Sequence, residues 1–427
     1  MKKAKDRLLL STLLISILFI FILLSGFASN AAAPSNANSV RLGFAGDMNL
    51  DENWATTQYL DKQSHGIYDC ISPNLIKLCN GFDLFMVNNE FSYSNRGTPL
   101  SGKKYTFRAN PTRIQALQAL GTDLVLLANN HIYDYGEEAF QDTLTTLQNA
   151  KIDYVGAGRN EADACRPVYY EYDGLKIAYV AATRAEKYIL TPEATATTSG
   201  VLRAYDPAKY LQVIQTAKAN SDYVIASIHW GTEYSNQAEQ YQRDLGHAMI
   251  NAGADAVIGS HTHVLQGLEY YHGKPIVYSL GNFWFNEKNL YSCVVELNVN
   301  KQTKTLDGMR FIPCIQKNCS TSWPADATEC RKIMDFEEGI SFGELSFYKN
   351  YRDEVWLYNL SVRKKHRSKG FGNAMLQYVI SRAKELGCST LHLKAEEDSW
   401  MENWYINKGF IPYYKEDGYT NLVLRLN

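Results

Sequence analysis

Net charge is almost absent from this sequence. Its 43 lysine and arginine residues nearly balance 45 aspartate and glutamate residues, which leaves a formal net charge of −2 at pH 7. A chain without a basic excess lacks the electrostatic footprint of a nucleic-acid-binding protein, so no nucleic-acid partner is expected. The 45% of hydrophobic and 21% of charged residues are typical of a globular protein. A length of 427 residues favours two folded units behind an N-terminal anchor.

Cysteine is too sparse for a fold built on disulfides. The eight cysteines lie at positions 70, 79, 165, 293, 314, 319, 330 and 388, and none belongs to a CxxC pattern that would indicate zinc or redox chemistry. Pairing is therefore optional. In an oxidising exterior the near pairs are Cys70 with Cys79, and two of Cys314, Cys319 and Cys330.

Charge is also missing from the apolar run between Leu8 and Leu24, which follows a basic stretch at residues 2–7. This pattern is typical of an export signal. Seventeen residues are long for a cleaved signal and short for a membrane span, so a retained single-pass anchor and a cleaved signal peptide both stay open. In either case the bulk of the chain is expected outside the cytoplasm, at the cell membrane or secreted. We assign residues 1–29 to the signal or membrane helix and residues 30–39 to a linker.

Short apolar strands alternate with helical patterns from Val40 onward. The strand segments read VRLGFAGD, DLFMVNNE, DLVLLANNH, YVIASIHWG, DAVIGSHTH and IVYSLGNF, and each ends in polar residues. Amphipathic helices such as EEAFQDTLTTLQNA and QRDLGHAMINAGA lie between them. This alternation predicts an α/β domain whose functional residues lie at the carboxyl ends of its strands.

The strand ends supply oxygen and nitrogen donors. They carry Asp47, Asn49, Glu90, Asn129, Asn130, His131, His229, His261, His263 and Asn282. Divalent cations need carboxylate, amide and imidazole ligands that converge from several elements. A single histidine such as His229 is more often a satisfied polar residue than a ligand. Several histidines together with acids and amides at neighbouring strand ends favour a metal site.

These segments resemble the CapA family, which is linked to poly-γ-glutamate capsule synthesis and is similar to calcineurin-like metallophosphoesterases. The resemblance covers residues 40–320 and includes the stretches LANNHIYDYG, IHWGTEY, GADAVIGSHTHVLQ and YSLGNF. It implies a four-layer αββα sandwich that binds one or two ions of manganese, magnesium or zinc. The implied metal ligands are Asp47, Asn49, Glu90, Asn130, His229, His261 and His263, and the implied acid that protonates a leaving oxygen is His131.

Three positions depart from the metallophosphoesterase pattern. Asn49 replaces the histidine of the first strand, Glu90 replaces the bridging aspartate, and GHxH reads GSHTH. Because an amide oxygen is a poorer donor than imidazole, the first metal position is expected to bind weakly or to prefer magnesium or manganese. Glu90 is the expected bridge between two ions.

Four further residues are candidates for the surroundings of this site. Trp230 and Glu233 are expected to line the pocket, and Lys103 and Arg108 to receive an anionic substrate. Solvated surface charge is the other interpretation of the two basic residues, and both interpretations stay open.

From Ser341 to the end, the sequence predicts two apolar strands, a glycine turn, a helix, a strand, a short helix and a last hairpin. Residues 341–427 resemble the latter half of the GNAT acetyltransferase superfamily. A strand that ends at Val362 leads into RSKGFG, which matches the RxxGxG/A turn of that family, and a Y-x-x-x-GF sequence follows at family spacing. Glycines let a backbone approach a pyrophosphate, and free amides at a helix N-terminus hold its charge. The resemblance implies acetyl-coenzyme A as a cofactor. The implied binding residues are Val362, Arg367, Lys369, Gly370 and Gly372, and the residue implied to protonate the departing thiolate is Tyr405.

This second domain is short. The 87 residues from 341 to the end lack room for the early strand and helices of the family, so the acceptor side is expected to be missing. An export signal also places the domain where acetyl-coenzyme A is not expected. An active domain and a degenerate, structural one both stay open. Residues 321–340 are expected to be the closing segment of the first domain and a linker.

Three functions remain. The first is an extracytoplasmic metal-dependent hydrolase that acts on a phosphoester or an amide-linked polymer. The second is a non-catalytic, anchored accessory subunit with poly-γ-glutamate synthase and export subunits and an anionic polymer as partners. The third is an N-acetyltransferase of an envelope polymer or amine. The resemblance favours a role in capsule or poly-γ-glutamate biosynthesis, whereas the fold alone does not select a reaction.

Overall fold

The computed structural model describes residues 38–185, 191–324, 343–349, 354–362, 371–385, 387–416 and 418–426. The chain divides into a main unit within Ser29–Ile340 and a C-terminal unit within Ser341–Asn427. The expected membrane segment of residues 1–29 lies outside the described residues. Within the described ranges, no helix is long and apolar enough to cross a membrane.

The first sheet of the main unit has the strand order β18-β17-β16-β1-β2-β5-β6, and β15 pairs with β1 beside this path. Its strands are β1 (Ser39–Met48), β2 (Leu84–Asn89), β5 (Leu124–Leu126), β6 (Asp153–Val155), β15 (Asn282–Trp284), β16 (Leu290–Asn300), β17 (Leu306–Lys317) and β18 (Ser320–Ser322). In this sheet, β1, β2, β5, β6 and β15 run parallel to one another. β16 pairs antiparallel with β1, and β17 and β18 continue the sheet in antiparallel pairs. β1 lies in the middle of the sheet and is buried throughout. β18 runs past residue 320, the expected end of the first domain.

The second sheet has the strand order β13-β14-β12-β11-β9-β8. Its strands are β8 (Val168–Tyr172), β9 (Leu175–Thr183), β11 (Tyr223–His229), β12 (Ala256–Ser260), β13 (Leu265–Tyr271) and β14 (Lys274–Leu280). The inner strands are parallel, and the edge strands β8 and β13 are antiparallel to their neighbours. Parallel strands that are covered on both faces read as apolar runs, and β11 is buried along its whole length.

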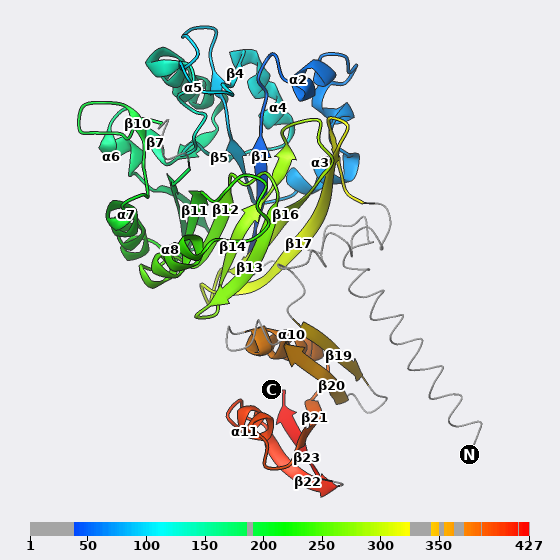
Figure 1. The fold of residues 1–427 in the computed structure, drawn as a ribbon. Helices are drawn as coiled ribbons and strands as arrows, with labels where there is room; N and C mark the ends of the chain where they lie inside the picture. The colour runs from blue at the N-terminus through cyan, green and yellow to red at the C-terminus, as the bar shows by residue number, and fades with distance from the viewer. Residues whose placement is uncertain are drawn as a thin grey trace. The chain divides into compact units, whose positions relative to one another are not determined.

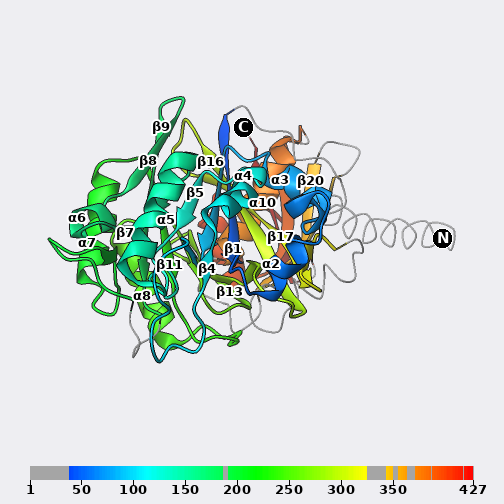
Figure 2. The same cartoon turned by 90° about the horizontal axis from the view of Figure 1, so that it is seen from above.

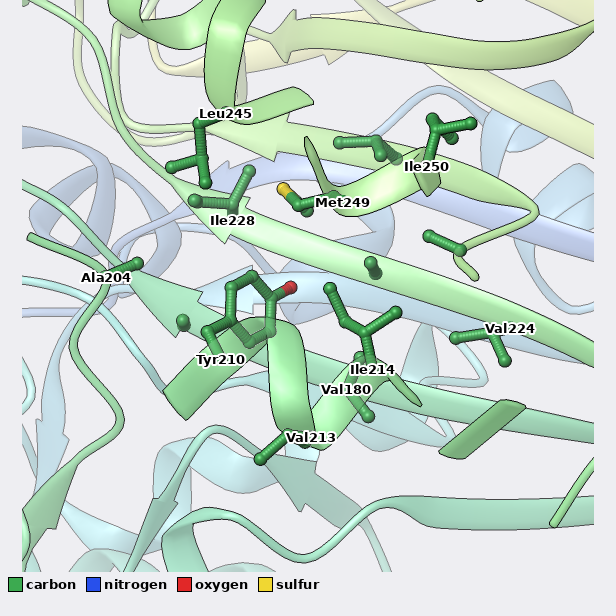
Figure 3. Packing of buried hydrophobic residues seen from close by; sticks show 14 of the residues in the cluster. Val180, Ala204, Tyr210, Val213, Ile214, Val224, Ile228, Leu245, Met249 and Ile250 are labelled. Atoms are coloured by element: carbon green, nitrogen blue, oxygen red, sulfur yellow. The ribbon is translucent and has the colours of Figure 1, made fainter. Parts of the chain in front are cut away.

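Helices and short strands connect these sheets. They are α2 (Ala55–Leu60), η1 (Gly66–Asp69), α3 (Pro73–Cys79), β3 (Ser92–Tyr93), β4 (Arg108–Ala109), η2 (Pro111–Arg113), α4 (Ile114–Ala119), α5 (Gly136–Ala150), β7 (Ala157–Gly158), α6 (Glu161–Ala164), β10 (Gly200–Val201), α7 (Ala208–Ala219) and α8 (Gln240–Asn251). α7 packs on β9 and β11, and α8 packs on β12 and β14. Figure 3 shows the hydrophobic cluster between these helices and the second sheet. It includes Tyr210 and Ile214 of α7, Met249 of α8 and Ile228 of β11. The two amphipathic helices expected from the sequence are present as α5 and α8.

The two sheets contact each other near the end of β1 (Figures 1 and 2). β1 contacts β12 and β14, and β16 contacts β13 and β14. At Gly46 an added Cβ would lie 1.7 Å from the carbonyl oxygen of Gly281. The Asp47 amide donates to that same carbonyl at 3.0 Å. Glycine at position 46 therefore lets the end of β1 approach the second sheet, which brings the functional edges of both sheets together.

The C-terminal unit has the element order that the sequence predicts. Its elements are β19 (Gly343–Lys349), β20 (Glu354–Val362), α10 (Phe371–Glu385), β21 (Thr390–Glu396), α11 (Trp400–Ile406), β22 (Ile411–Glu416) and β23 (Tyr419–Arg425). The sheet order is β19-β20-β21-β23-β22, in which β20 and β21 are parallel. Leu376 and Val379 of α10 share a core with Leu391 and Leu393 of β21. This unit thus has its own hydrophobic core.

None of the described cysteines forms a disulfide. Cys79 is the last residue of α3 and Cys70 precedes that helix, so the helix separates the two thiols that the sequence makes near neighbours. Burial raises the pKa of both thiols. Cys314 and Cys319 also form no disulfide, and Cys330 lies outside the described residues.

Candidate metal centre

The candidate ligands lie at the carboxyl edges of the two sheets. Asp47 is near the end of β1, Glu90 follows β2, Asn130 lies beyond β5, His229 ends β11, and His261 and His263 follow β12. None of these six residues is more than 4% exposed. Burying so many polar and ionisable side chains is costly unless partners or a bound ion compensate for the lost water.

Two sets of three side chains converge tightly enough to hold a metal ion. Among the described residues, Glu90, His229 and His261 form one set, and Asp47, Glu90 and His263 form the other. Within each set the ligand atoms lie within 4.8 Å of one another. Glu90 belongs to both sets, as a bridging carboxylate would. These donors fit a hard or borderline divalent cation.

Burial keeps the histidines of the first set neutral. The pKa of His229 and that of His261 lie well below the usual value, because burial disfavours the charged ring and neighbouring histidines repel it. His229 Nε2 lies 3.5 Å from a carboxylate oxygen of Glu90 and 2.7 Å from Oδ1 of Asn130. His261 Nδ1 is buried without a hydrogen-bond partner. Since neutral imidazole is the form that binds metals, the residues of this set fit a bound ion.

Asp47 is the ionised acid of the second set. Burial by itself would raise the pKa of the Asp47 carboxyl, but the hydrogen bond and charge of His263, with smaller contributions from His229 and Asn88, lower it below its usual value. His263 Nδ1 lies 3.2 Å from Asp47 Oδ2 and 2.9 Å from Oδ1 of Asn282. A carboxylate is therefore present in this set at neutral pH.

The turn after β12 has an unusual backbone. His261 and His263 have φ angles of 95° and 61°, which non-glycine residues rarely adopt. The His261 amide donates to Asp47 Oδ2 at 3.3 Å. The His261 ring lies 4.5 Å from that of His229 and 6.2 Å from that of His263, between ring centroids. Strained backbone of this kind persists where surrounding contacts fix it, and here it brings the rings of His261 and His263 within reach of Glu90.

Asn88 is a site residue that the sequence analysis missed. Its Nδ2 donates to Asp47 at 2.7 Å and to Glu90 at 3.2 Å, and lies 3.2 Å from His229 Nδ1. Its Oδ1 accepts from Asn129 at 3.1 Å. The signal was the first asparagine of DLFMVNNE, which stands two positions before Glu90, the residue predicted as a ligand. Asn88 thus links both ligand sets.

His131 is oriented by a second missed residue, Asp134. His131 Nδ1 lies 2.6 Å from Asp134 Oδ2, and His131 Nε2 lies 4.0 Å from the Glu90 carboxylate. Lys103 makes an ion pair with Asp134 at 2.9 Å and donates to the carbonyl of Asn130. The spacing of three residues between His131 and Asp134 was the available signal. The Lys103 side chain is only 5% exposed, so its interpretation as solvated surface charge is wrong.

Asn49 makes a local hydrogen bond at the end of β1. Its Oδ1 accepts from the Asp51 amide at 2.8 Å, and its Nδ2 is buried without a partner. No hydrogen bond between described residues links Asn49 to the remaining candidate ligands. Asn49, the weakest of the implied donors, therefore stabilises the turn that follows β1.

Trp230, one of the two expected pocket-lining residues, lies elsewhere. Trp230 is fully buried in the hydrophobic cluster of the second sheet, where its Nε1 donates to the Tyr278 carbonyl at 2.9 Å. Successive residues of an extended segment point to opposite faces of a sheet. Because His229 points to the site, Trp230 points to the face that the helices cover. Glu233 is exposed. The Arg108 guanidinium donates to main-chain carbonyls, one of them at 2.8 Å, and lies 4.2 Å from the Tyr135 ring centroid.

The acetyltransferase-like residues are only partly described. Val362 is the last residue of β20, and Gly372 lies in the first turn of α10. Arg367, Lys369 and Gly370 lie outside the described residues. Tyr405 belongs to α11 and is 5% exposed, with its ring 5.5 Å from that of Phe410 between centroids. Burial raises the pKa of Tyr405 to about 12, so the phenol stays protonated at neutral pH.

The fold and the site define an α/β protein with a buried candidate centre for divalent metal at the joined edges of two sheets. The model of the family "Bacterial capsule synthesis protein PGA_cap" matches residues 41–287, more than half of the chain, and the chain belongs to this family. Residues 314–406 match the model of the acetyltransferase (GNAT) family, so a GNAT domain is present at the C-terminus.

Curated relatives and a solved structure are similar to this chain. The PGA biosynthesis protein CapA of Bacillus subtilis is 32% identical over 263 residues, which cover 59% of this chain and 68% of that protein. The capsule biosynthesis protein CapA of Bacillus anthracis is 37% identical over 189 residues, which cover 43% of this chain and 45% of that protein. The crystal structure of a phosphatase from Mycoplasma pneumoniae matches with a TM-score of 0.43 and 16% identity, over 66% of this chain and 95% of that one.

Proposed function

We propose that this chain acts in the biosynthesis of a poly-γ-glutamate capsule and that its main unit is a metal-dependent hydrolase. The observation that carries the hydrolase proposal is Glu90, a fully buried carboxylate shared by two sets of candidate ligands. Relatives named for PGA and capsule biosynthesis support the biological role. Two contacting sheets with helices packed on them support the four-layer metallophosphoesterase-type arrangement. The substrate class is a phosphoester or an amide-linked polymer.

Manganese, magnesium or zinc would occupy one or both ligand sets. Glu90 would serve both positions, with His229 and His261 completing one and Asp47 and His263 completing the other. A bound divalent ion supplies Lewis-acid activation of the bond to be cleaved. Neutral histidines and an ionised aspartate have the protonation states that such binding requires.

His131 is the proposed acid for the leaving group. Its Nε2 faces Glu90 at 4.0 Å, while its Nδ1 is held by Asp134 at 2.6 Å. An aspartate on Nδ1 fixes the orientation of the ring and leaves Nε2 to hold the proton that a departing oxygen or nitrogen needs.

The proposal extends to location and partners. The basic and apolar N-terminal sequence supports a chain that is anchored at or exported across the cell membrane. An extracytoplasmic main unit would meet the growing anionic polymer beside the subunits that synthesise and export it.

The C-terminal domain is a second candidate activity. Its match to the GNAT family and the succession of β20 and α10 support acetyl-coenzyme A binding at the start of α10. Isothermal titration of the full chain with coenzyme A tests this, and absence of binding would leave the domain a structural role.

The hydrolase is tested on the full chain by metal content and hydrolysis of bis-p-nitrophenyl phosphate and poly-γ-glutamate. The test variant is Asp47→Asn with His261→Asn. The matched control is Asp173→Asn with His272→Asn, an exposed pair in which the histidine also has a positive φ, 50° against 95° for His261.

We expect wild type and control to hold metal and to show metal-dependent turnover, and the test variant to lose both. Equal metal content in all three proteins would reject the site. Metal binding without turnover on either substrate would reject the hydrolase and favour the non-catalytic accessory subunit.

A further inference from the structure

Two arginines lie close in the backbone to the end of β11, which carries the candidate ligand His229. Arg184 directly follows β9, and its amide donates to the carbonyl of His229 at 2.8 Å. Arg203 follows β10 and is joined to Thr183 by a parallel bridge. Backbone contacts thus place Arg184 beside His229, and Arg203 beside Thr183, which pairs with His229 on the neighbouring strand.

Aromatic rings hold the guanidinium groups. The Arg184 guanidinium carbon lies 3.7 Å from the ring centroid of Tyr241 and 5.5 Å from that of Tyr205. The Arg203 guanidinium carbon lies 5.4 Å from the same Tyr205 ring. The Tyr241 hydroxyl accepts from the Gly231 amide at 2.8 Å, two residues beyond His229. We call these two arginines and two tyrosines the arginine–tyrosine cluster.

Among the described residues, no acid pairs with the positive charge of this cluster. In the part of the chain that the structure describes, neither arginine makes an ion pair, whereas Arg41, Arg96 and Arg113 all bind carboxylates. The acid beside Tyr241 is Glu239, whose carboxylate caps α8 and accepts from Thr232. All four cluster residues are partly buried.

An unpaired, aromatic-stacked guanidinium is suited to bind an anion. Stacking on a ring covers the guanidinium face and leaves its N–H edge free for a carboxylate, which it can bind through two parallel hydrogen bonds. Two such groups near one ring repel each other in the absence of an anion and are stabilised when one binds.

We propose that the arginine–tyrosine cluster binds carboxylate groups of an acidic polymer and so positions the chain of that polymer at the adjacent metal centre. The inference rests on the proposed function for the identity of the polymer. It assigns substrate recognition to residues outside both ligand sets, which makes the cluster a determinant of specificity.

The test measures binding of fluorescently labelled poly-γ-glutamate to the full chain by anisotropy. The test variant is Arg184→Gln with Arg203→Gln. The matched control is Arg159→Gln with Arg425→Gln, which removes the same charge from two exposed positions. A second variant, Arg184→Lys with Arg203→Lys, keeps the charge and loses the planar fork. Thermal melting and metal content are measured for every protein, and unlabelled polyphosphate serves as competitor.

We expect the glutamine variant to bind at least about tenfold more weakly than the control, with melting and metal content unchanged, and the lysine variant to lie between them. Binding by the glutamine variant as tight as by the control overturns the inference. So does a wild type that binds polyphosphate but not poly-γ-glutamate. Metal content and hydrolysis in the same samples report on the proposed function separately.

Discussion

Asn88 contacts residues of both ligand sets of the candidate centre. It donates to Asp47 and Glu90 and adjoins His229. An amide between two buried carboxylates reduces their repulsion without adding charge. The residue therefore stabilises the centre in the absence of metal.

Asn88→Asp should make folding depend on metal. The substitution places a third carboxylate beside Asp47 and Glu90, so we expect a lower melting temperature without metal and a larger rise on adding Mn²⁺ than in wild type. The measurement is thermal melting with and without Mn²⁺. Asn89→Asp is the control, because the Asn89 amide donates to the Phe91 carbonyl. Equal Mn²⁺ responses in both variants would contradict the assignment.

Asp134→Asn should slow hydrolysis without removing metal. Its carboxylate holds His131 Nδ1 at 2.6 Å, so we expect turnover to fall about 10- to 100-fold while metal content stays constant. Asp142→Asn, which changes a carboxylate bonded to Ser94, is the control.

Leaving-group dependence separates proton donation from a structural role of Asp134. A p-nitrophenolate needs little protonation, whereas an alkoxide needs a proton as it departs. Asp134→Asn should therefore affect methyl esters more than p-nitrophenyl esters. The same loss on both would show that Asp134 acts only on structure.

The sequence predicts candidate ligands at the strand ends but does not reveal Asn88, which connects them. Asp47 pairs with Asn88 on β2, and this pairing is not encoded in local sequence. A polar residue that ends an apolar strand is visible alone. The cross-strand neighbour that orients it is visible only when the strands are aligned.

At the scale of elements, the crossing of β1 with the segment after β14 positions Asp47. A Cβ at Gly46 would meet the Gly281 carbonyl, and backbone cannot move aside as a side chain can. Close approach of the backbone at Gly46 to the Gly281 carbonyl is thus required at the edge where both ligand sets assemble.

Gly46→Ala should lower both stability and metal content. We expect a loss of about 1–3 kcal/mol or more, because β1 must shift away from the second sheet and carry Asp47 with it. Urea unfolding and metal analysis give the two readings. Gly308→Ala on β17 is the control, since nothing lies within 4 Å of its added Cβ. A Gly46 variant as stable as this control would refute the argument.

The elements themselves were largely predictable, whereas the face of the sheet on which Trp230 lies was not. Apolar runs marked β1, β2, β11 and β12, and amphipathic periodicity marked α5 and α8. Trp230 was misplaced because its side of the sheet depends on the helix that covers it, which sequence spacing does not reveal.

At the scale of the whole molecule, two separate cores predict two unfolding events. The main unit has the large cluster around Tyr210 and Met249, whereas the C-terminal unit has a smaller one around Leu376 and Leu391. A smaller domain buries a smaller fraction of its surface and is less stable. The element order of the C-terminal unit was correctly predicted because its motifs lie close together in sequence.

Calorimetry of the full chain should show two transitions, with the C-terminal unit melting at the lower temperature. A chain that ends at residue 324 keeps every strand of the two main sheets, so it should lose only the lower transition and keep its metal content and poly-γ-glutamate hydrolysis. Arg425→Gln in the full chain, which changes one exposed residue of the smaller unit, should retain both transitions. A single cooperative transition in the full chain, or metal loss on truncation, would mean that the GNAT domain is needed for the stability of the capsule-synthesis domain.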